Sequence, residues 1–419
     1  MRVAHFVHRY PPALGGSEAY FARLSRHLAQ AGDRVTVFTT SALDLEAFWL
    51  PQGRRLPAGV TWEEGVEVRR YAPAWYFRGR RYVLKALSLP PLRTWQLLTM
   101  PCNPIAPGMW RDAGRSDPPF DVVHATAFPY GWVLASAARL ARRLRVPFVV
   151  TPFLHLGDPD DPHDPSRRTY LSPALSTVLA EARRVFVQTD VERDALLRHG
   201  VPGEKLVLQG MGVDAPACTG GDRCRARAAW GVAPADVVVG HLANKSVEKG
   251  TVDLLRAAES AWAAGCRFRL VLAGPEMRNF LTFWEGYGAK DRVTRLGALD
   301  EACKRDFLAG LDVLAMPSRS DSFGLVFLEA WANGVPSLAY RAGGVPGVIR
   351  DGKDGILAGC GDVGALADGL RRLVEDAALR TRMGKAGWGR LAQEFRWEDK
   401  LELVRRVYGE IAQAPGHLG

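Results

Sequence analysis

Two acidic residues that lie eight positions apart, Asp321 and Glu329, give the strongest chemical signal in this sequence. They flank Phe323-Gly324-Leu325, where a loop after an apolar strand is expected to turn into a helix. The first amides of a helix are free and carry partial positive charge, so they favour a phosphate group. The helix start at Gly324, Leu325 and Val326 is therefore predicted to hold phosphate. Glu329 is predicted to accept hydrogen bonds from ribose hydroxyls, and Asp321 from the hydroxyls of a further sugar.

A scaffold of alternating strands and helices must bring these groups together, and the sequence shows that pattern in two consecutive sets. The first set contains a helix whose residues Phe21, Leu24 and Leu28 are spaced to bury one face. Its strands are predicted at residues 3–7, 34–40, 121–125, 147–151 and 184–188. The second set has predicted strands at 237–242, 268–273, 312–316 and 337–340, and helices at 252–264 and 325–333. Such alternation indicates parallel sheets.

Two doubly wound, Rossmann-like α/β domains that face each other across a cleft are therefore predicted. They cover residues 1–212 and 213–395, and the boundary falls in the Gly-rich stretch 210–222. Ligands of doubly wound sheets bind at the carboxyl ends of the strands, so the cleft is the expected site.

The composition is that of a globular protein. Of 419 residues, 47% are hydrophobic and 24% charged, which suits two or three domains. No run of 18 uncharged apolar residues occurs, so no membrane-spanning helix is expected. The opening MRVAHFVHRYPP is predicted to be a strand, not a signal peptide. Six scattered cysteines without metal-ligand spacing indicate reduced thiols in a cytoplasmic protein, with no bound metal.

Residues 317–344 resemble the donor-site signature of the retaining family 4 glycosyltransferases, which have the GT-B fold. That signature has two glutamates around Phe-Gly-Leu, followed by Glu-Ala and Gly-x-Pro. This chain matches it at Phe323-Gly324-Leu325, Glu329-Ala330 and Gly334-Val335-Pro336. Asp321 stands where the first glutamate is usual, so the carboxylate is kept on a shorter arm.

Several other segments resemble the same family. Gly15-Gly16-Ser17-Glu18 is similar to its glycine loop, which implies that Gly16 lies near the donor phosphate. Residues 210–214, 296–297 and 343–346 are similar to its hinge, nucleobase and second glycine segments, although Gly347 replaces a usual glutamate. The resemblance also implies that a final helix at Trp397–Ala412, within the tail 396–419, crosses back onto the first domain.

The positive charge for the leaving diphosphate is expected from Lys249. Lys249-Gly250 resembles the family's phosphate-binding lysine, which neutralises charge as the glycosidic bond breaks. His241 occupies the position of a usual arginine, and Lys245, in the loop 243–248, is the other candidate for a second cation. A histidine at a strand end often only packs, so both interpretations of His241 stay open.

A further catalytic residue is expected on the first domain. Residues 121–126 resemble a strand-end motif that often carries two histidines, and Thr126 holds the second histidine's position. His124 is then the predicted catalytic residue, and burial beneath the site is the alternative. His155, after the strand ending at Thr151, is another candidate to face the donor sugar.

The resemblance implies transfer of a hexose or related sugar from a nucleoside diphosphate sugar to a hydroxyl acceptor, with retention. Polysaccharide, glycolipid or cell-envelope glycan synthesis is the expected setting. No metal or other cofactor is implied. Two alternatives stay open because family positions are altered: a nucleotide-sugar binding protein without transferase activity, and a GT-B-fold nucleotide-sugar epimerase.

Residues 69–115 depart from the α/β pattern, because they mix Arg and Lys with Trp, Tyr, Phe and Leu, and prolines interrupt any long helix. Such a surface suits an anionic membrane or a lipid-linked sugar acceptor, and packing on the domain is the alternative. The net charge of +10 also favours an anionic partner. A peripheral location on the inner face of the membrane follows from the first interpretation. The basic residues are dispersed without a recognition motif, which argues against nucleic acid.

Overall fold

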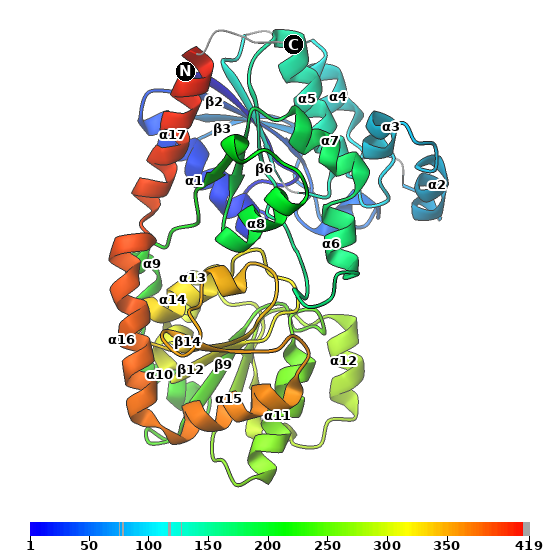
Figure 1. The fold of residues 1–419 in the computed structure, drawn as a ribbon. Helices are drawn as coiled ribbons and strands as arrows, with labels where there is room; N and C mark the ends of the chain where they lie inside the picture. The colour runs from blue at the N-terminus through cyan, green and yellow to red at the C-terminus, as the bar shows by residue number, and fades with distance from the viewer. Residues whose placement is uncertain (75, 78, 116–118, 127, 414–419) are drawn as a thin grey trace.

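The computed structural model describes residues 1–413, apart from 75, 78, 116–118 and 127. It has two lobes (Figure 1), each built on one sheet. The first sheet has eight strands in the order β3-β4-β2-β1-β5-β6-β7-β8, parallel except between β3 and β4. The strands are β1 (Arg2–Phe6), β2 (Arg34–Thr40), β3 (Gly59–Glu63), β4 (Val66–Tyr71), β5 (Val122–Thr126), β6 (Phe148–Thr151), β7 (Arg184–Val187) and β8 (Leu206–Leu208).

The helices of the first lobe follow the crossovers between these strands. They are α1 (Gly16–Gln30), α2 (Arg80–Leu87), α3 (Arg93–Leu98), α4 (Pro107–Ala113), α5 (Gly131–Leu144), α6 (Pro165–Tyr170), α7 (Pro173–Glu181) and α8 (Asp190–Arg198). Short 3₁₀ turns lie at Leu45–Phe48 and Gly203–Lys205.

The second lobe holds a six-stranded sheet, in the order β11-β10-β9-β12-β13-β14, in which every pair is parallel. Its strands are β9 (Val238–Leu242), β10 (Arg269–Ala273), β11 (Val293–Arg295), β12 (Val313–Met316), β13 (Ser337–Tyr340) and β14 (Gly355–Ala358). Its helices are α9 (Ala215–Cys218), α10 (Arg223–Ala229), α11 (Thr251–Ala263), α12 (Arg278–Glu285), α13 (Glu301–Gly310), α14 (Leu325–Ala332), α15 (Val363–Glu375) and α16 (Ala377–Glu394), with 3₁₀ turns at Lys290–Arg292 and Val345–Gly347. The last helix of the chain is α17 (Trp397–Gln413).

Both faces of each sheet are covered, which explains why the strands are apolar runs and do not alternate with polar residues. In β1, Val3 lies in one buried cluster and Ala4 and Phe6 lie in another. In the second sheet, Val238 and Val239 divide between two clusters in the same way. The α/β class is thereby confirmed, and the predicted strands agree with the structure to within one residue at each end.

The chain crosses between the lobes twice, and the two crossings touch each other. Val213 donates a backbone hydrogen bond to Phe395, 2.9 Å away. Gly212 has no room for a side chain, because a Cβ atom there would lie 2.7 Å from Trp397. The domain limits at residues 212 and 395 stay predictions, and both lie in these crossings.

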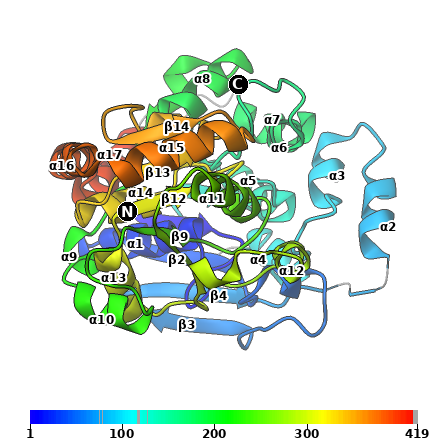
Figure 2. The same ribbon diagram turned by 90° about the horizontal axis from the view of Figure 1, so that it is seen from below.

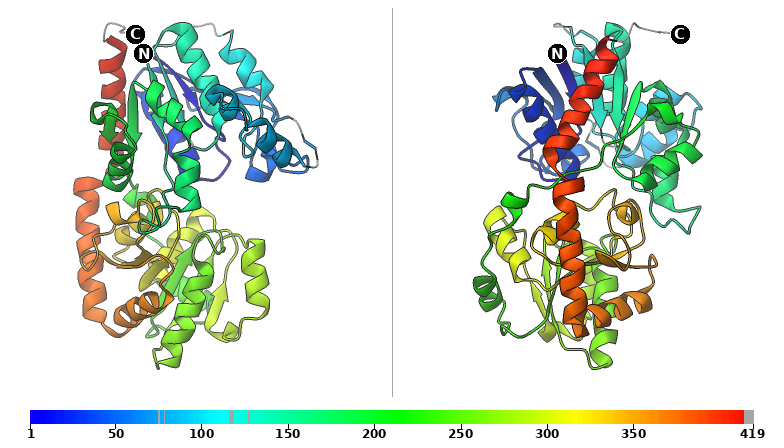
Figure 3. Two further views of the ribbon diagram at one scale, coloured as in Figure 1. Left: turned by 45° about the vertical axis from the view of Figure 1, so that its right-hand side comes forward. Right: turned by 60° about the vertical axis from the view of Figure 1, so that its left-hand side comes forward.

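The last helix, α17, returns to the first lobe (Figure 3), as the resemblance implied. Its Tyr408 is fully buried against β1 and β5. The Tyr408 hydroxyl lies 3.3 Å from His5 Nε2 and makes a shorter hydrogen bond with His124 Nδ1. At the surface, Arg405 forms an ion pair of 2.9 Å with Asp33. The buried polar cluster of His5, His124 and Tyr408 therefore holds the helix α17 against the strands β1 and β5.

The variant Tyr408→Phe is expected to lower the free energy of unfolding by about 1–3 kcal/mol, because it leaves buried histidine nitrogens without this partner. Urea unfolding measures the effect. Tyr82→Phe, at a side chain that is 80% exposed, is the control and should change stability little. Equal stability of Tyr408→Phe and the wild type would show that this cluster does not fasten α17.

Candidate active site between the lobes

An ion pair between Lys249 and Asp321 lies at the carboxyl ends of the strands of the second sheet, where the lobes face each other. Lys249 ends the loop after β9, and Asp321 follows β12. The Lys249 side chain is 32% exposed and the Asp321 side chain 14%. Burial by itself would raise the pKa of Asp321, but Lys249 and His155 hold that pKa below its usual value. The carboxylate therefore stays ionised in a largely desolvated place.

The backbone leaves little freedom around this pair. Gly250 adopts a positive φ of 71°, and a Cβ atom there would lie 1.8 Å from the Pro317 carbonyl oxygen. Arg319 also donates a backbone hydrogen bond of 3.0 Å to Glu248. These contacts join the two loops that carry Lys249 and Asp321, and only glycine fits at the closest point.

A glycine pair packs on the other side of Asp321. Gly344 donates a 2.7 Å hydrogen bond to the Asp321 carbonyl, and its Cβ position is 1.8 Å from the Ser322 oxygen. Gly343 donates a 2.7 Å hydrogen bond to Gly157 of the first lobe. The Gly343-Gly344 segment therefore fits between the lobes because it has no side chains.

His155 reaches this site from the first lobe. Its Nδ1 lies 2.6 Å from the Ser320 carbonyl oxygen, and its ring lies 5.2 Å from that of Tyr170. Burial lowers the pKa of His155, Asp321 opposes that effect and Lys249 adds to it. Of the three candidates in the first lobe, His155 is thus the one within electrostatic reach of the Lys249–Asp321 pair.

The start of α14 lies four residues after Asp321. Gly324 precedes the helix with a positive φ of 88°, which favours glycine at this N-terminus. The amides of Leu325 and Val326 belong to the first turn, so the helix itself supplies no carbonyl acceptor for them. The predicted phosphate seat is therefore formed in the structure, and its use stays a prediction.

Glu329, one turn further along α14, is held by a residue that the sequence did not reveal. Lys304 of α13 forms an ion pair of 2.6 Å with Glu329 Oε1. Both side chains are partly exposed, at 25% and 18%. Glu329 Oε2 makes no hydrogen bond with the described residues, which leaves one carboxylate oxygen available for a ligand hydroxyl.

A cavity of about 750 Å³ opens beside Lys249. It lies between the loop after β9 and α12 and is lined mainly by polar side chains. The lining residues are Asn244, Ser246, Glu248, Lys249, Met277, Arg278, Asn279 and Thr282. This space is large enough for a nucleotide-sized ligand next to the Lys249 ammonium.

Two predicted cations do not face the cleft. His241 is fully buried, with Nδ1 at 2.9 Å from the Ala315 carbonyl and Nε2 at 3.0 Å from the Thr251 hydroxyl. Burial lowers the pKa of His241 to about 4, so this side chain is neutral at pH 7. Lys245 is also buried, and its ammonium lies 2.5 Å from the Leu296 carbonyl and 3.3 Å from Glu276. Neither His241 nor Lys245 is therefore placed to supply the second positive charge, because neither side chain points into the site.

The predicted contact of His124 with the donor is also corrected. His124 is fully buried, and Nε2 lies 2.8 Å from the Thr151 hydroxyl while Nδ1 binds Tyr408. Burial, and then His5, hold the pKa of His124 well below its usual value. Thr126 is buried too and donates to the Thr151 carbonyl at 2.8 Å. His124 is thus part of the cluster beneath the cleft, which was the alternative interpretation.

The glycine loop after β1 encloses a buried acid. Gly15 precedes α1, Gly16 begins it, and a Cβ atom at Gly15 would lie 2.2 Å from Glu18 Oε2. Glu18 Oε1 pairs with Arg9 at 2.5 Å and lies 3.3 Å from His8. Gly16 has open space around its Cβ position. The Glu18 carboxylate packs against Gly15 at a distance that leaves no room for a side chain there. The phosphate contact of Gly16 stays a prediction.

Among the described residues, no group of three or more metal-ligating side chains is close enough to hold an ion. The acidic segment around Asp158 and Asp164 instead caps backbone amides, because Asp164 accepts bonds from Asp158 and Ser166. No helix among the described residues has the length and hydropathy needed to cross a bilayer.

Comparisons with known proteins agree with this geometry. Residues 222–389 match the family model of the glycosyl transferases group 1, and residues 15–212 match that of a glycosyl transferase 4-like domain. The D-inositol 3-phosphate glycosyltransferase of Mycobacterium tuberculosis (strain H37Rv) is 30% identical over 418 residues, which cover 94% of this chain and 80% of that relative.

Two solved structures share the fold over nearly the whole chain. Sucrose-phosphate synthase from Thermosynechococcus elongatus has a TM-score of 0.74 at 20% identity, covering 99% of this chain and 100% of that one. HepE from Anabaena, solved with UDP-glucose, has a TM-score of 0.71 at 20% identity, covering 98% and 100%. The likeness confirms the predicted GT-B fold.

Glu18 gives a prediction of pH-dependent stability. Burial raises its pKa, but His8, Arg9 and Ser17 more than offset that effect and lower it to about 2. A lowered carboxyl pKa adds stability that is complete above the unfolded value near 4.5 and is lost as the pH falls towards 2. Glu18→Gln should therefore lower the free energy of unfolding at pH 7 by on the order of 3 kcal/mol.

The difference between the wild type and Glu18→Gln should shrink as the pH falls from 5 to 3, which urea unfolding at several pH values measures. A difference that stays constant from pH 7 to pH 3 would contradict the lowered pKa. Glu46→Gln, at an exposed carboxylate without an ion pair among the described residues, is the control.

Proposed function

Because the chain belongs to the group 1, family 4-like glycosyltransferases, we propose that it transfers a sugar from a nucleoside diphosphate sugar to a hydroxyl acceptor, with retention of configuration. The observation that carries this proposal is the Lys249–Asp321 pair, which stands beside the free amides of α14 and the adjoining cavity. Anabaena HepE, of the same fold, was solved with UDP-glucose, which supports a nucleotide-sugar donor here.

The diphosphate takes the place of Asp321 as the partner of Lys249. Its oxygens accept hydrogen bonds from the Lys249 ammonium and from the first amides of α14. As the glycosidic bond breaks, negative charge grows on the departing phosphate, and a preorganised ammonium and helix N-terminus stabilise it. The chain meets this charge with its own groups, so we propose no resident metal or other cofactor.

The carboxylates of Asp321 and Glu329 bind the donor sugar and the ribose, respectively. Asp321, released from Lys249, accepts hydrogen bonds from hydroxyls of the donor sugar. Glu329 accepts from the ribose hydroxyls, and Lys304 keeps the Glu329 carboxylate in position. No protein nucleophile is assigned: the acceptor hydroxyl attacks on the face from which the diphosphate leaves, which retains the configuration, and its proton passes to the departing diphosphate oxygen. His155 closes the sugar pocket from the first lobe.

Lys249→Ala is expected to lower the turnover number by about two orders of magnitude or more, on the scale of one lost stabiliser of leaving-group charge. The measurement is release of nucleoside diphosphate from a donor chosen by a thermal-shift screen of nucleotide sugars, since a bound ligand raises apparent stability. Lys385→Ala, at an exposed lysine of α16, is the matched control and should keep wild-type turnover. Unchanged turnover in Lys249→Ala would remove this lysine from the mechanism.

We further propose that the acceptor belongs to a polysaccharide, glycolipid or cell-envelope glycan, and that the protein works in the cytoplasm against the inner face of a membrane. The helix α2 lies at the outer edge of the first lobe, and α3 lies between α2 and the helices α5 and α7, on which it packs (Figure 2). These helices and the turn between them expose large apolar side chains, namely Tyr82 at 80%, Leu89 at 77%, Leu92 at 66% and Trp95 at 43%. This pair of helices is the element expected to touch the bilayer.

The charge of the same segment suits an anionic lipid surface. The sequence has no acidic residue between Glu67 and Asp112, while Arg81, Lys85 and Arg93 lie on or beside the two helices. Basic side chains next to exposed aromatic and aliphatic groups are typical of interfacial helices on anionic lipids.

Leu89→Glu should weaken co-sedimentation with anionic phosphatidylserine vesicles by about fivefold or more, because it removes an apolar contact and adds repulsion. Binding of the wild type should also fall as salt is raised. Trp388→Glu changes an apolar side chain that is 63% exposed on the second lobe and should bind as the wild type does. Failure of the wild type to bind these vesicles at low salt would refute membrane contact through α2 and α3.

A further inference from the structure

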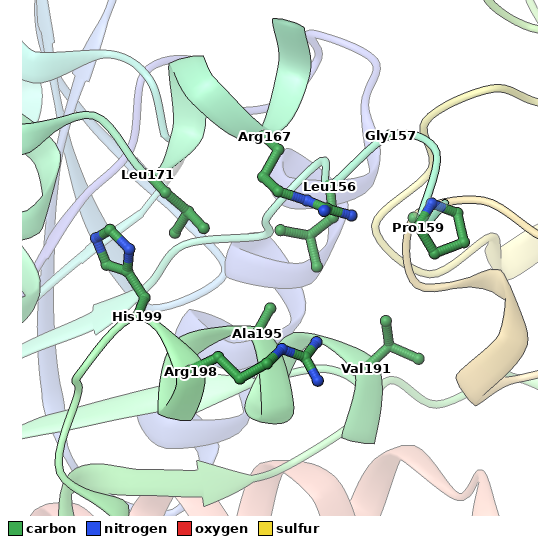
Figure 4. Close-up of a pocket in the computed structure, with 10 residues that line it drawn as sticks. Leu156, Gly157, Pro159, Arg167, Leu171, Val191, Ala195, Arg198 and His199 are labelled. Atoms are coloured by element: carbon green, nitrogen blue, oxygen red, sulfur yellow. The ribbon is translucent and has the colours of Figure 1, made fainter. Parts of the chain in front are cut away.

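A second cavity lies in the first lobe, between α6, α8 and the loop after β6 (Figure 4). Its volume is about 490 Å³. The lining residues are Leu156, Gly157, Pro159, Arg167, Leu171, Val191, Ala195, Arg198, His199 and Gly343. Two of them, Gly157 and Gly343, also form the contact between the lobes described above, and Gly343 forms the rim on the side of the second lobe.

The cavity combines an apolar floor with two guanidinium groups. The side chains of Leu156, Leu171 and Val191 supply apolar surface, and Arg167 and Arg198 extend over it (Figure 4). Arginine side chains bind phosphate oxygens through paired N–H donors. The lining thus offers guanidinium N–H donors and apolar side chains within one cavity.

The nearby carboxylates do not neutralise these arginines. Asp164 accepts backbone hydrogen bonds from Asp158, Ser166 and Arg167. Asp194 pairs with Arg193, 3.3 Å away. Within the described residues, neither Arg167 nor Arg198 has an ion pair, and Arg167 donates only to the Asp158 carbonyl, at 3.1 Å. Both guanidinium groups therefore keep N–H donors that a ligand can use, next to the aspartates of the loop 158–164.

The cavity is separate from the donor site, although one loop borders both. His155 faces Ser320 and is not part of the cavity lining, while the next residue, Leu156, is. Gly157, which closes the cavity, accepts the hydrogen bond from Gly343 across the lobes. A ligand in the cavity would thus lie against a direct contact between the lobes.

We propose that this cavity binds a small phosphorylated ligand that carries an apolar group. The phosphate lies between Arg167 and Arg198, and the apolar group lies on Leu156, Leu171 and Val191. His199, held by a 2.7 Å hydrogen bond with Ser176, lies beside Leu171 on the side of the cavity away from the two guanidinium groups (Figure 4). This inference does not rest on the transfer reaction, since none of its residues touches the proposed donor.

Phenyl phosphate is a suitable probe, and a ³¹P NMR titration measures its binding. Saturable binding is expected in the wild type, with the dissociation constant raised at least about tenfold in Arg198→Gln, on the scale of a lost charge-assisted hydrogen bond. Arg143→Gln, at an exposed arginine of α5, is the matched control and should bind as the wild type does. Benzyl alcohol, which has the ring without the charge, should not compete.

Saturating UDP and the Lys249→Ala variant separate this site from the donor site. Binding of phenyl phosphate should persist under both conditions, and that result would stand even if the proposed donor site failed its own test. Absence of saturable binding, equal binding by Arg198→Gln and the wild type, or full displacement by UDP would each overturn the proposal.

Discussion

The candidate site depends on one electrostatic constraint, the placement of the Lys249 ammonium and the Asp321 carboxylate in a largely desolvated gap between two lobes. An isolated charge there would be costly, because burial removes its hydration. Each group therefore needs a partner of opposite sign. In the free protein they neutralise each other, and on the proposed mechanism a diphosphate takes over the lysine while a sugar takes over the aspartate. The pair thus keeps the site ordered until the donor enters.

The fold serves this constraint by bringing loops into close contact. Gly250 and the Gly343-Gly344 segment touch neighbouring carbonyl oxygens so closely that no side chain fits. The first lobe then adds His155, whose position depends on its bond to Ser320 of the second lobe. Because α17 fastens the chain end to the first lobe through Tyr408, both crossings between the lobes are tied close together. Relative movement of the lobes would therefore act directly on the site.

Much of the fold could be predicted from the sequence, because strands buried on both faces appear as short apolar runs. The strands at Arg34–Thr40 and Ser337–Tyr340 were placed without error, and the other predicted strands differ from the structure by one residue at one or both ends. The pairing of Lys249 with Asp321 agrees with the expectation that both lie at strand ends. Their chemical roles, and that of Gly16, stay predictions.

The errors come from side-chain direction and from contacts distant in sequence. A histidine near a strand end can point into the cleft or under it, and local spacing does not distinguish the two, so the sequence left both orientations of His124 and His241 open, and the structure has both side chains buried. Lys245 was expected in the cleft because its loop borders it, yet its ammonium turns inward to the Leu296 carbonyl. The Lys304–Glu329 and His155–Ser320 contacts join residues 25 and 165 positions apart, and no motif marks them.

A structure determined with a bound nucleoside diphosphate sugar tests the central claim most directly. The account predicts diphosphate oxygens within hydrogen-bond distance of the Lys249 ammonium and of the amides that begin α14, with Asp321 turned from the lysine to the sugar. Diphosphate bound elsewhere, with the Lys249–Asp321 pair still intact, would contradict it.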